Sequence, residues 1–239
     1  MPRRPRFFVA NVPYHVIQRG NNKDVIFRNN GDYLFFLSIL KEAKLKYPCF
    51  MYSYCLMPNH FHLLIQPSEK DNISFLMKFL GDKYVFYINK KYNRSGTLWE
   101  GRFRSSLIDR EQYFLACLRY IEMNPVRACL VKAPELYRWS SYRFRAFGEK
   151  NHILDLDQWY ISLGENSTKQ QMNYRRFIND SVLESKIEVI REMTQRGGIA
   201  GSDKFKNEIE KILGKKIIIR LPGRPSKTGS DPVFGATSV

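Results

Sequence analysis

The first 147 residues predict an α+β fold of the ferredoxin-like type, an antiparallel sheet with helices on one face. Runs of alternating or Tyr- and Phe-rich residues indicate four strands, and apolar residues at helical spacing indicate the helices between them. In chain order these elements are β-α-β-β-α-β, the order of a split unit of this type, and one more helix follows the last strand. The 239-residue chain is 44% hydrophobic, which is enough to bury such a core.

Residues that stop strands and helices set the boundaries of these elements. Gly20 begins a turn after the first strand, Pro48 stops the first helix, and Asn124-Pro125 ends the last one. The turn at 57–59 joins the second and third strands as a hairpin. The predicted elements are a strand at 14–19, a helix at 31–46, strands at 50–57 and 60–66, a helix at 73–92, a strand at 98–109 and a helix at 111–123.

The composition changes after about residue 147, which suggests a second part of the chain. Two further helices are expected there, at 174–190 and 203–213, and the sequence leaves open whether they form a helix-turn-helix. From residue 221 the chain is rich in Gly, Ser, Thr and Pro, a composition typical of disorder. The expected organisation is a domain at 1–147, a mainly helical, basic extension at 148–220 and a disordered tail at 221–239.

The charge balance indicates a polyanionic partner. The chain has 39 Lys and Arg against 23 Asp and Glu, a formal net charge of +16. Such an excess is typical of proteins that bind nucleic acid, although it can also serve solubility alone.

Several other classes of protein are excluded or disfavoured. No run of about 18 apolar residues is present, and the N-terminus lacks the apolar core of a signal peptide, so we expect no membrane association. The four cysteines show no CxxC pairing, which argues against a disulfide framework or a cysteine zinc site. Neither a Walker pattern nor GxGxxG occurs, so no nucleotide cofactor is expected. The sequence therefore predicts a soluble, cytoplasmic protein.

The most specific local signal is His60-Phe61-His62 on the third predicted strand. Residues two apart on a strand point to the same face, so the two imidazoles should lie side by side while Phe61 faces the core. Two neutral imidazoles can supply adjacent ligands to one metal ion. The spacing is equally compatible with two strand histidines that bind no metal.

The last predicted helix supplies a second set of polar residues. Tyr113, Cys117, Tyr120 and Asn124 follow at helical spacing and should share one face. Tyrosine is a competent nucleophile in phosphoryl transfer when a metal or base helps its phenol lose a proton. The amide of Asn124 could complete a metal site begun by the histidines. Alternatively, Tyr120 is a residue at the core's edge and Asn124 caps the helix before Pro125.

Four blocks of the sequence resemble the single-tyrosine transposases of the HUH superfamily. The first carries the HUH signature, two histidines around a bulky apolar residue, and the combination is most similar to the REP-associated tyrosine transposases. The resemblance covers roughly residues 7–147 and implies the ferredoxin-like fold. The blocks are, in chain order, Met57-Pro-Asn-His-Phe-His-Leu-Leu64, Leu98-Trp-Glu-Gly-Arg-Phe103, Arg119-Tyr-Ile-Glu-Met-Asn-Pro-Val-Arg-Ala128 and Trp139-Ser-Ser-Tyr142.

The resemblance also implies a reaction and its residues. The catalytic tyrosine corresponds to Tyr120, with Tyr113 as the rival on the same helix, and the metal ligands correspond to His60, His62 and Asn124. A divalent ion, Mg²⁺ or Mn²⁺, would polarise the scissile phosphate of single-stranded DNA. The tyrosine would then form a 5′-phosphotyrosine and release a 3′-hydroxyl, and another hydroxyl could reverse the step without ATP.

Relatives in this family recognise imperfect DNA hairpins beside the cleaved strand. Candidate phosphate contacts are Arg19, Lys23, Arg102 and Arg104, which could also be solvated charges. Trp99, like Phe103, could stack on an unpaired base or belong to the core. Arg224 lies in a Gly-Arg-Pro sequence like that of an AT-hook, although a flexible basic tail explains it equally simply.

Two other functions share the predicted fold. A non-catalytic module that binds single-stranded DNA or RNA would keep the basic surface without needing the histidines, the tyrosine and the asparagine together. An HUH replication or conjugation nickase would share the chemistry, but those proteins usually carry a larger histidine-rich site. The resemblance further implies a bacterial, nucleoid-associated protein that acts as a monomer or a homodimer.

Overall fold

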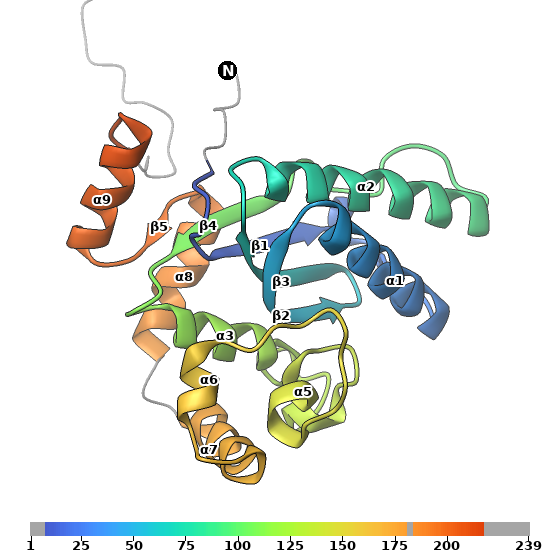
Figure 1. Ribbon diagram of the computed structural model, residues 1–239. Helices are drawn as coiled ribbons and strands as arrows, with labels where there is room; N and C mark the ends of the chain where they lie inside the picture. Colours follow the sequence, from blue (N-terminus) through green and yellow to red (C-terminus); the bar gives the residue numbers. More distant parts are fainter. Residues whose placement is uncertain (1–7, 181–183, 218–239) are drawn as a thin grey trace, which may run out of the picture.

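A five-stranded sheet forms the centre of the computed structural model, which describes residues 8–180 and 184–217 (Figure 1). The strand order is β2-β3-β1-β4-β5, and the three pairs among the first four strands are antiparallel. This order confirms the predicted ferredoxin-like unit. The strands are β1 (Tyr14–Arg19), β2 (Cys49–Met57), β3 (His60–Pro67), β4 (Arg104–Ile108) and β5 (Ile199–Ala200).

Two long helices, α1 (Asn30–Lys46) and α2 (Asn72–Lys91), cover one face of the sheet, as expected for this unit (Figure 1). The Phe36 ring of α1 lies 4.7 Å from the Phe61 ring of β3, and the Tyr84 ring of α2 lies 5.1 Å from Phe36. Since Phe61 points to these helices, its neighbour His62 points to the opposite face.

The opposite face is covered by α3 (Phe114–Glu122) and by α8 (Glu184–Arg196), a helix of the C-terminal extension (Figure 1). The Phe114 ring packs edge-on against Tyr52 of β2, and Thr194 of α8 shares a hydrogen bond with Ser106 of β4. Both faces of the sheet are therefore buried. The remaining elements are η1 (Asn21–Lys23), α4 (Asn124–Arg127), η2 (Pro134–Leu136), α5 (Tyr142–Phe147), α6 (Gln158–Ser162), α7 (Ser167–Asn179) and α9 (Asp203–Leu213).

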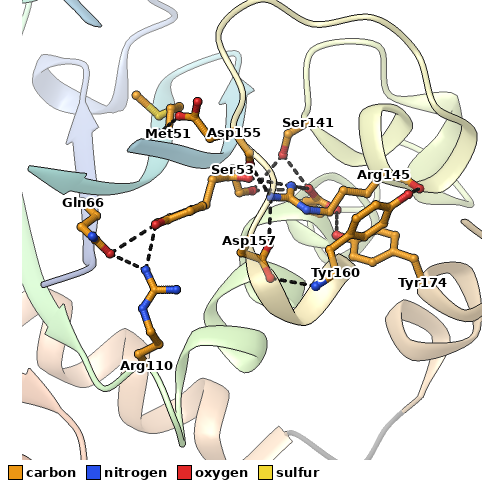
Figure 2. Close-up of polar contacts among 12 residues, drawn as sticks. Met51, Ser53, Gln66, Arg110, Ser141, Arg145, Asp155, Asp157, Tyr160 and Tyr174 are labelled. Carbon is orange, nitrogen blue, oxygen red and sulfur yellow. Dashed lines mark hydrogen bonds and ion pairs between the residues drawn. The ribbon is translucent and has the colours of Figure 1, made fainter. Parts of the chain in front are cut away.

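A buried polar network holds α3 in place beneath the sheet (Figure 2). Glu122, at the end of α3, is fully buried and accepts hydrogen bonds from Ser141 and from Tyr174 of α7, each at 2.6 Å. Arg145 of α5 is also fully buried, and it donates to the backbone oxygen of Tyr52 and to the Asp157 carboxylate. The network joins residues on both sides of position 147, so the extension packs directly on the helix that follows the sheet.

The structure corrects the predicted strand at 98–109. Only Arg104–Ile108 is a strand, because Gly101 adopts a positive φ of 133° and the chain before it leaves the sheet. Trp99 instead forms an isolated bridge with Gly20, and its ring packs toward Tyr84 of α2.

The single helix predicted at 174–190 is also wrong. Its apolar residues belong to two helices, α7 and α8, because α7 ends at Asn179 and Asp180 is extended. The short strand β5 was not predicted: it lies between glycines and pairs parallel to β4. The helix predicted at 203–213 is confirmed as α9. The tail at 221–239 lies outside the described residues, and none of the described helices has the length and apolar character needed to span a membrane.

Candidate active site

A cleft of about 960 Å³ opens where the sheet face of β1, β3 and β4 meets α3, α4 and α8. Its walls include all four residues that the resemblance assigns to catalysis and metal binding, namely His60, His62, Tyr120 and Asn124. Strand pairing explains part of this arrangement, since Arg19 lies opposite His60 and Ile17 lies opposite His62 on adjacent antiparallel strands.

The two histidines of β3 lie side by side, with ring centroids 5.0 Å apart. They differ in burial, because α3 covers His62, which is 1% exposed, while His60 is only partly buried. Burial, together with the nearby charge of Arg19, lowers the pKa of His60 to about 4. Burial also holds the pKa of His62 well below its usual range. Both rings are therefore neutral at pH 7, which is the form that binds metal ions.

Hydrogen bonds orient both imidazoles. His60 Nδ1 lies 2.6 Å from Asn59 Oδ1, and the Asn59 amide nitrogen donates to Lys23 O, so the amide oxygen faces His60. An amide oxygen only accepts, which places the proton of His60 on Nδ1 and leaves Nε2 as a free lone pair. His62 Nδ1 lies 2.8 Å from His15 Nε2, while His62 Nε2 is buried and has no hydrogen-bond partner among the described residues.

Tyr120 packs against the histidines from α3. Its ring is edge-on to His62, with centroids 5.6 Å apart, and edge-on to His15 at 5.5 Å. Burial raises the pKa of the Tyr120 phenol, and the charges of Arg127 and Arg191 oppose that shift. The guanidinium of Arg127 lies 5.2 Å from the centre of the Tyr120 ring. The side chain is 9% exposed, so a small opening to the cleft remains.

Asn124 follows Tyr120 by one helical turn. Its amide nitrogen donates to the backbone oxygen of Tyr120 at 2.7 Å, so the amide oxygen remains as an acceptor. Tyr113, the rival tyrosine, lies at the start of α3 outside the walls of the cleft, and the amine of Lys186 lies 5.7 Å from its ring centre. The structure thus separates the two tyrosines that the sequence places on one helix.

The donor atoms in the cleft fit a divalent ion. Within residues 8–180 and 184–217, no group of three or more His, Cys, Asp and Glu side chains could hold a metal. The ligands that the resemblance assigns, two imidazole nitrogens and the amide oxygen of Asn124, line the same cleft and would form the protein part of the site. The unpartnered Nε2 of His62 supports this assignment, because a buried polar atom without a partner costs free energy unless something binds it. Imidazole ligands favour Mn²⁺ over Mg²⁺, which prefers oxygen.

The walls of the cleft are strongly basic. Of the described residues that line it, eight are Lys or Arg and one, Glu100, is acidic. The basic residues are Arg19, Arg102, Arg104, Arg127, Arg191, Arg196, Lys215 and Lys216. Three of the predicted DNA contacts, Arg19, Arg102 and Arg104, are therefore among them.

The other predicted DNA contacts lie elsewhere. Lys23 belongs to η1, after the end of β1, and does not line the cleft. Trp99 is half-buried, with its ring 5.9 Å from Phe61, and together with Phe103 it lines a second, more apolar pocket of about 670 Å³ beside α2. Arg224 lies outside the described residues.

Sequence reasoning missed several residues of the site. His15 could have been found, because strand alternation places it on the same face as Ile17 and Arg19, in a chain with only four histidines. Arg191 and Thr194 could not, because α8 reaches the cleft only through tertiary packing.

Comparison with known proteins agrees with the fold and with the resemblance to the REP-associated tyrosine transposases. Residues 8–124 match the model of the family described as Transposase IS200 like. A Haemophilus influenzae protein assigned as a REP-associated tyrosine transposase is 30% identical over 118 residues. That match covers 45% of this chain and 66% of the relative's own length. Residues 8–124 are therefore similar to the IS200-like transposase family.

A solved structure also shares the fold. It is described as a REP-associated tyrosine transposase bound to a REP hairpin. It superposes with a TM-score of 0.53 and 17% sequence identity, covering 66% of this chain and 93% of the other. At that identity the likeness concerns the fold alone.

Proposed function

We propose that this protein cleaves and rejoins single-stranded DNA next to hairpins, with Tyr120 as the nucleophile and a divalent ion held by His60, His62 and Asn124. The observation that carries this proposal is the position of Tyr120. Its ring lies edge-on to His62, in a cleft that also holds His60, Asn124 and eight basic residues. This arrangement combines a nucleophile, metal donors and phosphate-binding charge at one place.

Each residue has a defined part in the reaction. His60 and His62 would hold the ion through their Nε2 atoms and Asn124 through its amide oxygen. A divalent ion supplies polarisation of a phosphoryl oxygen at such a site. Arg127 and Arg191 favour the phenolate of Tyr120, since both charges lower its pKa. The remaining basic residues hold the DNA backbone near the nucleophile.

The covalent step balances without a cofactor that carries energy. Tyr120 Oη attacks phosphorus, the bond from phosphorus to the 3′ oxygen breaks, and the 5′ phosphate remains on the tyrosine. The phenolic proton passes to solvent, and the departing 3′ oxygen takes up a proton to become a hydroxyl. A 3′-hydroxyl from another strand then attacks the phosphotyrosine, which restores the phenol and rejoins the DNA.

Hairpin DNA is the substrate that we propose. The relative of known structure is described as bound to a REP hairpin, and the basic cleft of this chain has the charge to bind a DNA backbone. All four site residues come from one chain, which supports a monomeric active site, and a homodimer is the alternative. A module that only binds single strands would not need Tyr120 beside the histidines.

A covalent-adduct assay tests the proposal. Labelled single-stranded hairpin DNA from the flanking genome is incubated with the protein and Mn²⁺, with EDTA as the control. We expect an adduct that resists SDS, requires the metal and disappears in Tyr120→Phe but persists in Tyr113→Phe. An adduct lost in Tyr113→Phe instead would move the nucleophile to Tyr113. Tight binding without any adduct would contradict the enzyme and favour the non-catalytic module.

A further inference from the structure

A line of buried hydrogen bonds connects the extension helix α8 to the predicted metal ligand His62. Thr194 Oγ1 donates to the backbone oxygen of Ile190 at 2.7 Å. His15 Nδ1 lies 2.8 Å from Thr194 Oγ1, and His15 Nε2 lies 2.8 Å from His62 Nδ1. The three side chains are each 3% exposed or less, so water does not compete for these contacts.

The chemistry of the groups determines which atom is the donor in each of these hydrogen bonds. A threonine hydroxyl has one proton, and here the backbone oxygen of Ile190 takes it, because a carbonyl can only accept. The oxygen of Thr194 must therefore accept from His15 Nδ1, and it also accepts from Ser106, whose oxygen is 2.8 Å away. His15 thus carries its proton on Nδ1.

The same reasoning passes from His15 to His62. A neutral imidazole has one N–H, so His15 Nε2 is a lone pair and accepts a hydrogen bond from His62 Nδ1. His15 is 1% exposed and its two hydrogen-bond partners, Thr194 and His62, carry no negative charge, so its ring stays neutral. With the proton of His62 on Nδ1, its Nε2 presents a bare lone pair. That is the buried atom for which the described residues provide no partner.

We propose that His15 and Thr194 are positioning residues that hold His62 in the tautomer with its proton on Nδ1, so that Nε2 is free to bind the divalent ion. Metal-binding histidines need such a partner on the other ring nitrogen to fix the tautomer and the orientation of the ring. The use of this tautomer rests on the proposed function, whereas the tautomer itself is a property of the metal-free protein. The extension therefore helps to build the metal site through Thr194.

The test measures the tautomer directly by nuclear magnetic resonance of ¹⁵N-labelled histidine in the full-length, metal-free protein. We expect His62 and His15 of the wild type to carry their protons on Nδ1. Thr194→Val removes the hydroxyl with little change in shape, so both tautomers of His15 and His62 should become populated. We expect the Kd for Mn²⁺ to rise about 10-fold in this variant.

Two matched variants separate positioning from general packing. Thr194→Ser keeps the hydroxyl and should restore the wild-type tautomer and Mn²⁺ affinity. Ser106→Ala removes a hydrogen bond to the same Thr194 oxygen. It leaves the donors and acceptors of the hydrogen bonds from Thr194 to His15 and from His15 to His62 unchanged, so this variant should show the wild-type tautomer and Mn²⁺ affinity. A wild-type His62 with its proton on Nε2 would overturn the inference without need of any variant. An unchanged tautomer and Mn²⁺ affinity in Thr194→Val would also overturn it.

The outcome is distinguishable from that of the proposed function. If the predicted tautomer is found but no DNA adduct forms, the positioning stands and the nuclease activity fails. If a Tyr120 adduct forms while His62 carries its proton on Nε2, the activity stands and the positioning by His15 and Thr194 fails.

Discussion

The buried histidines make a specific prediction about stability and pH. His15 and His62 are each 1% exposed, and burial lowers the pKa of His15 from 6.5 to about 3 and that of His62 well below 6.5. In the unfolded chain both titrate near 6.5. The unfolded state therefore binds more protons than the folded state below pH 6.5. Stability is complete above that pH and falls as the pH drops toward the folded pKa values.

The magnitude follows from proton linkage. One proton bound only in the unfolded state changes the free energy of unfolding by about 1.4 kcal/mol per pH unit. Between pH 7 and pH 5, His15 alone should cost about 2 kcal/mol, because its titration in the unfolded chain begins near pH 6.5. His62 should cost about the same again, and so should His60, whose pKa in the folded protein is about 4. The free energy of unfolding should therefore fall by about 6 kcal/mol.

Urea unfolding of the metal-free protein in EDTA, measured at pH 7 and pH 5, tests this prediction. His15→Gln removes one of the three titrating groups, His15, His60 and His62, and should reduce the pH-dependent loss by about a third. His152 is exposed, so His152→Gln should leave the loss unchanged. A wild-type free energy of unfolding that is equal at the two pH values would refute the reasoning. So would a His15→Gln variant with the full pH dependence.

Three further predictions concern the site and its support. Arg145→Met leaves Glu122 buried without its cation, and the free energy of unfolding measured in urea should fall by about 3–5 kcal/mol. The same change at the more exposed Arg143 should cost less than about 1 kcal/mol. Equal losses in the two variants would contradict a stabilising role of the buried network. Asn124→Ala should weaken Mn²⁺ binding measured by calorimetry, and Asn124→Asp, which keeps an oxygen donor, should retain the binding. An unchanged Mn²⁺ affinity in Asn124→Ala would show that Asn124 is not a metal ligand. Arg191→Ala should weaken binding to single-stranded DNA in fluorescence anisotropy and reduce the slope of log K against log salt by about 0.7, and an unchanged slope would place Arg191 away from the DNA backbone.

Much of the fold could be predicted because it depends on local patterns. Strand β1 occupies the predicted residues 14–19, and α1 and α2 begin one residue before their predicted starts. Amphipathic periodicity and stop residues act within a few turns of the chain, so they are visible in the sequence. The elements that were predicted wrongly or not at all are those whose structure depends on tertiary contacts. The chain at 98–103 leaves the sheet, and Trp99 packs against α2. Strand β5 forms only because Ile199 and Ala200 pair with the edge of β4.

In the candidate site, too, local geometry predicts some features, while others depend on tertiary packing. The side-by-side placement of His60 and His62 follows from strand geometry, and the place of Asn124 beside Tyr120 follows from helix geometry. Their common cleft, however, requires α3 to cross the face of β3, which no local pattern specifies. Thr194 and Arg191 come from α8, in a segment where the predicted helix was wrong. The sequence therefore contains the reactive residues but not the residues that orient them.

Peptide mapping of the DNA adduct tests the central claim most directly. Trypsin cleaves after Arg110, Arg119 and Arg127, so Tyr113 and Tyr120 fall in different peptides. Mass spectrometry of the digested adduct, after nuclease trimming of the DNA, shows which peptide carries the nucleotide. The account predicts the added mass on the peptide at 120–127, localised to Tyr120. Added mass on the peptide at 111–119, or on any other peptide, would contradict the assignment of Tyr120 as the nucleophile.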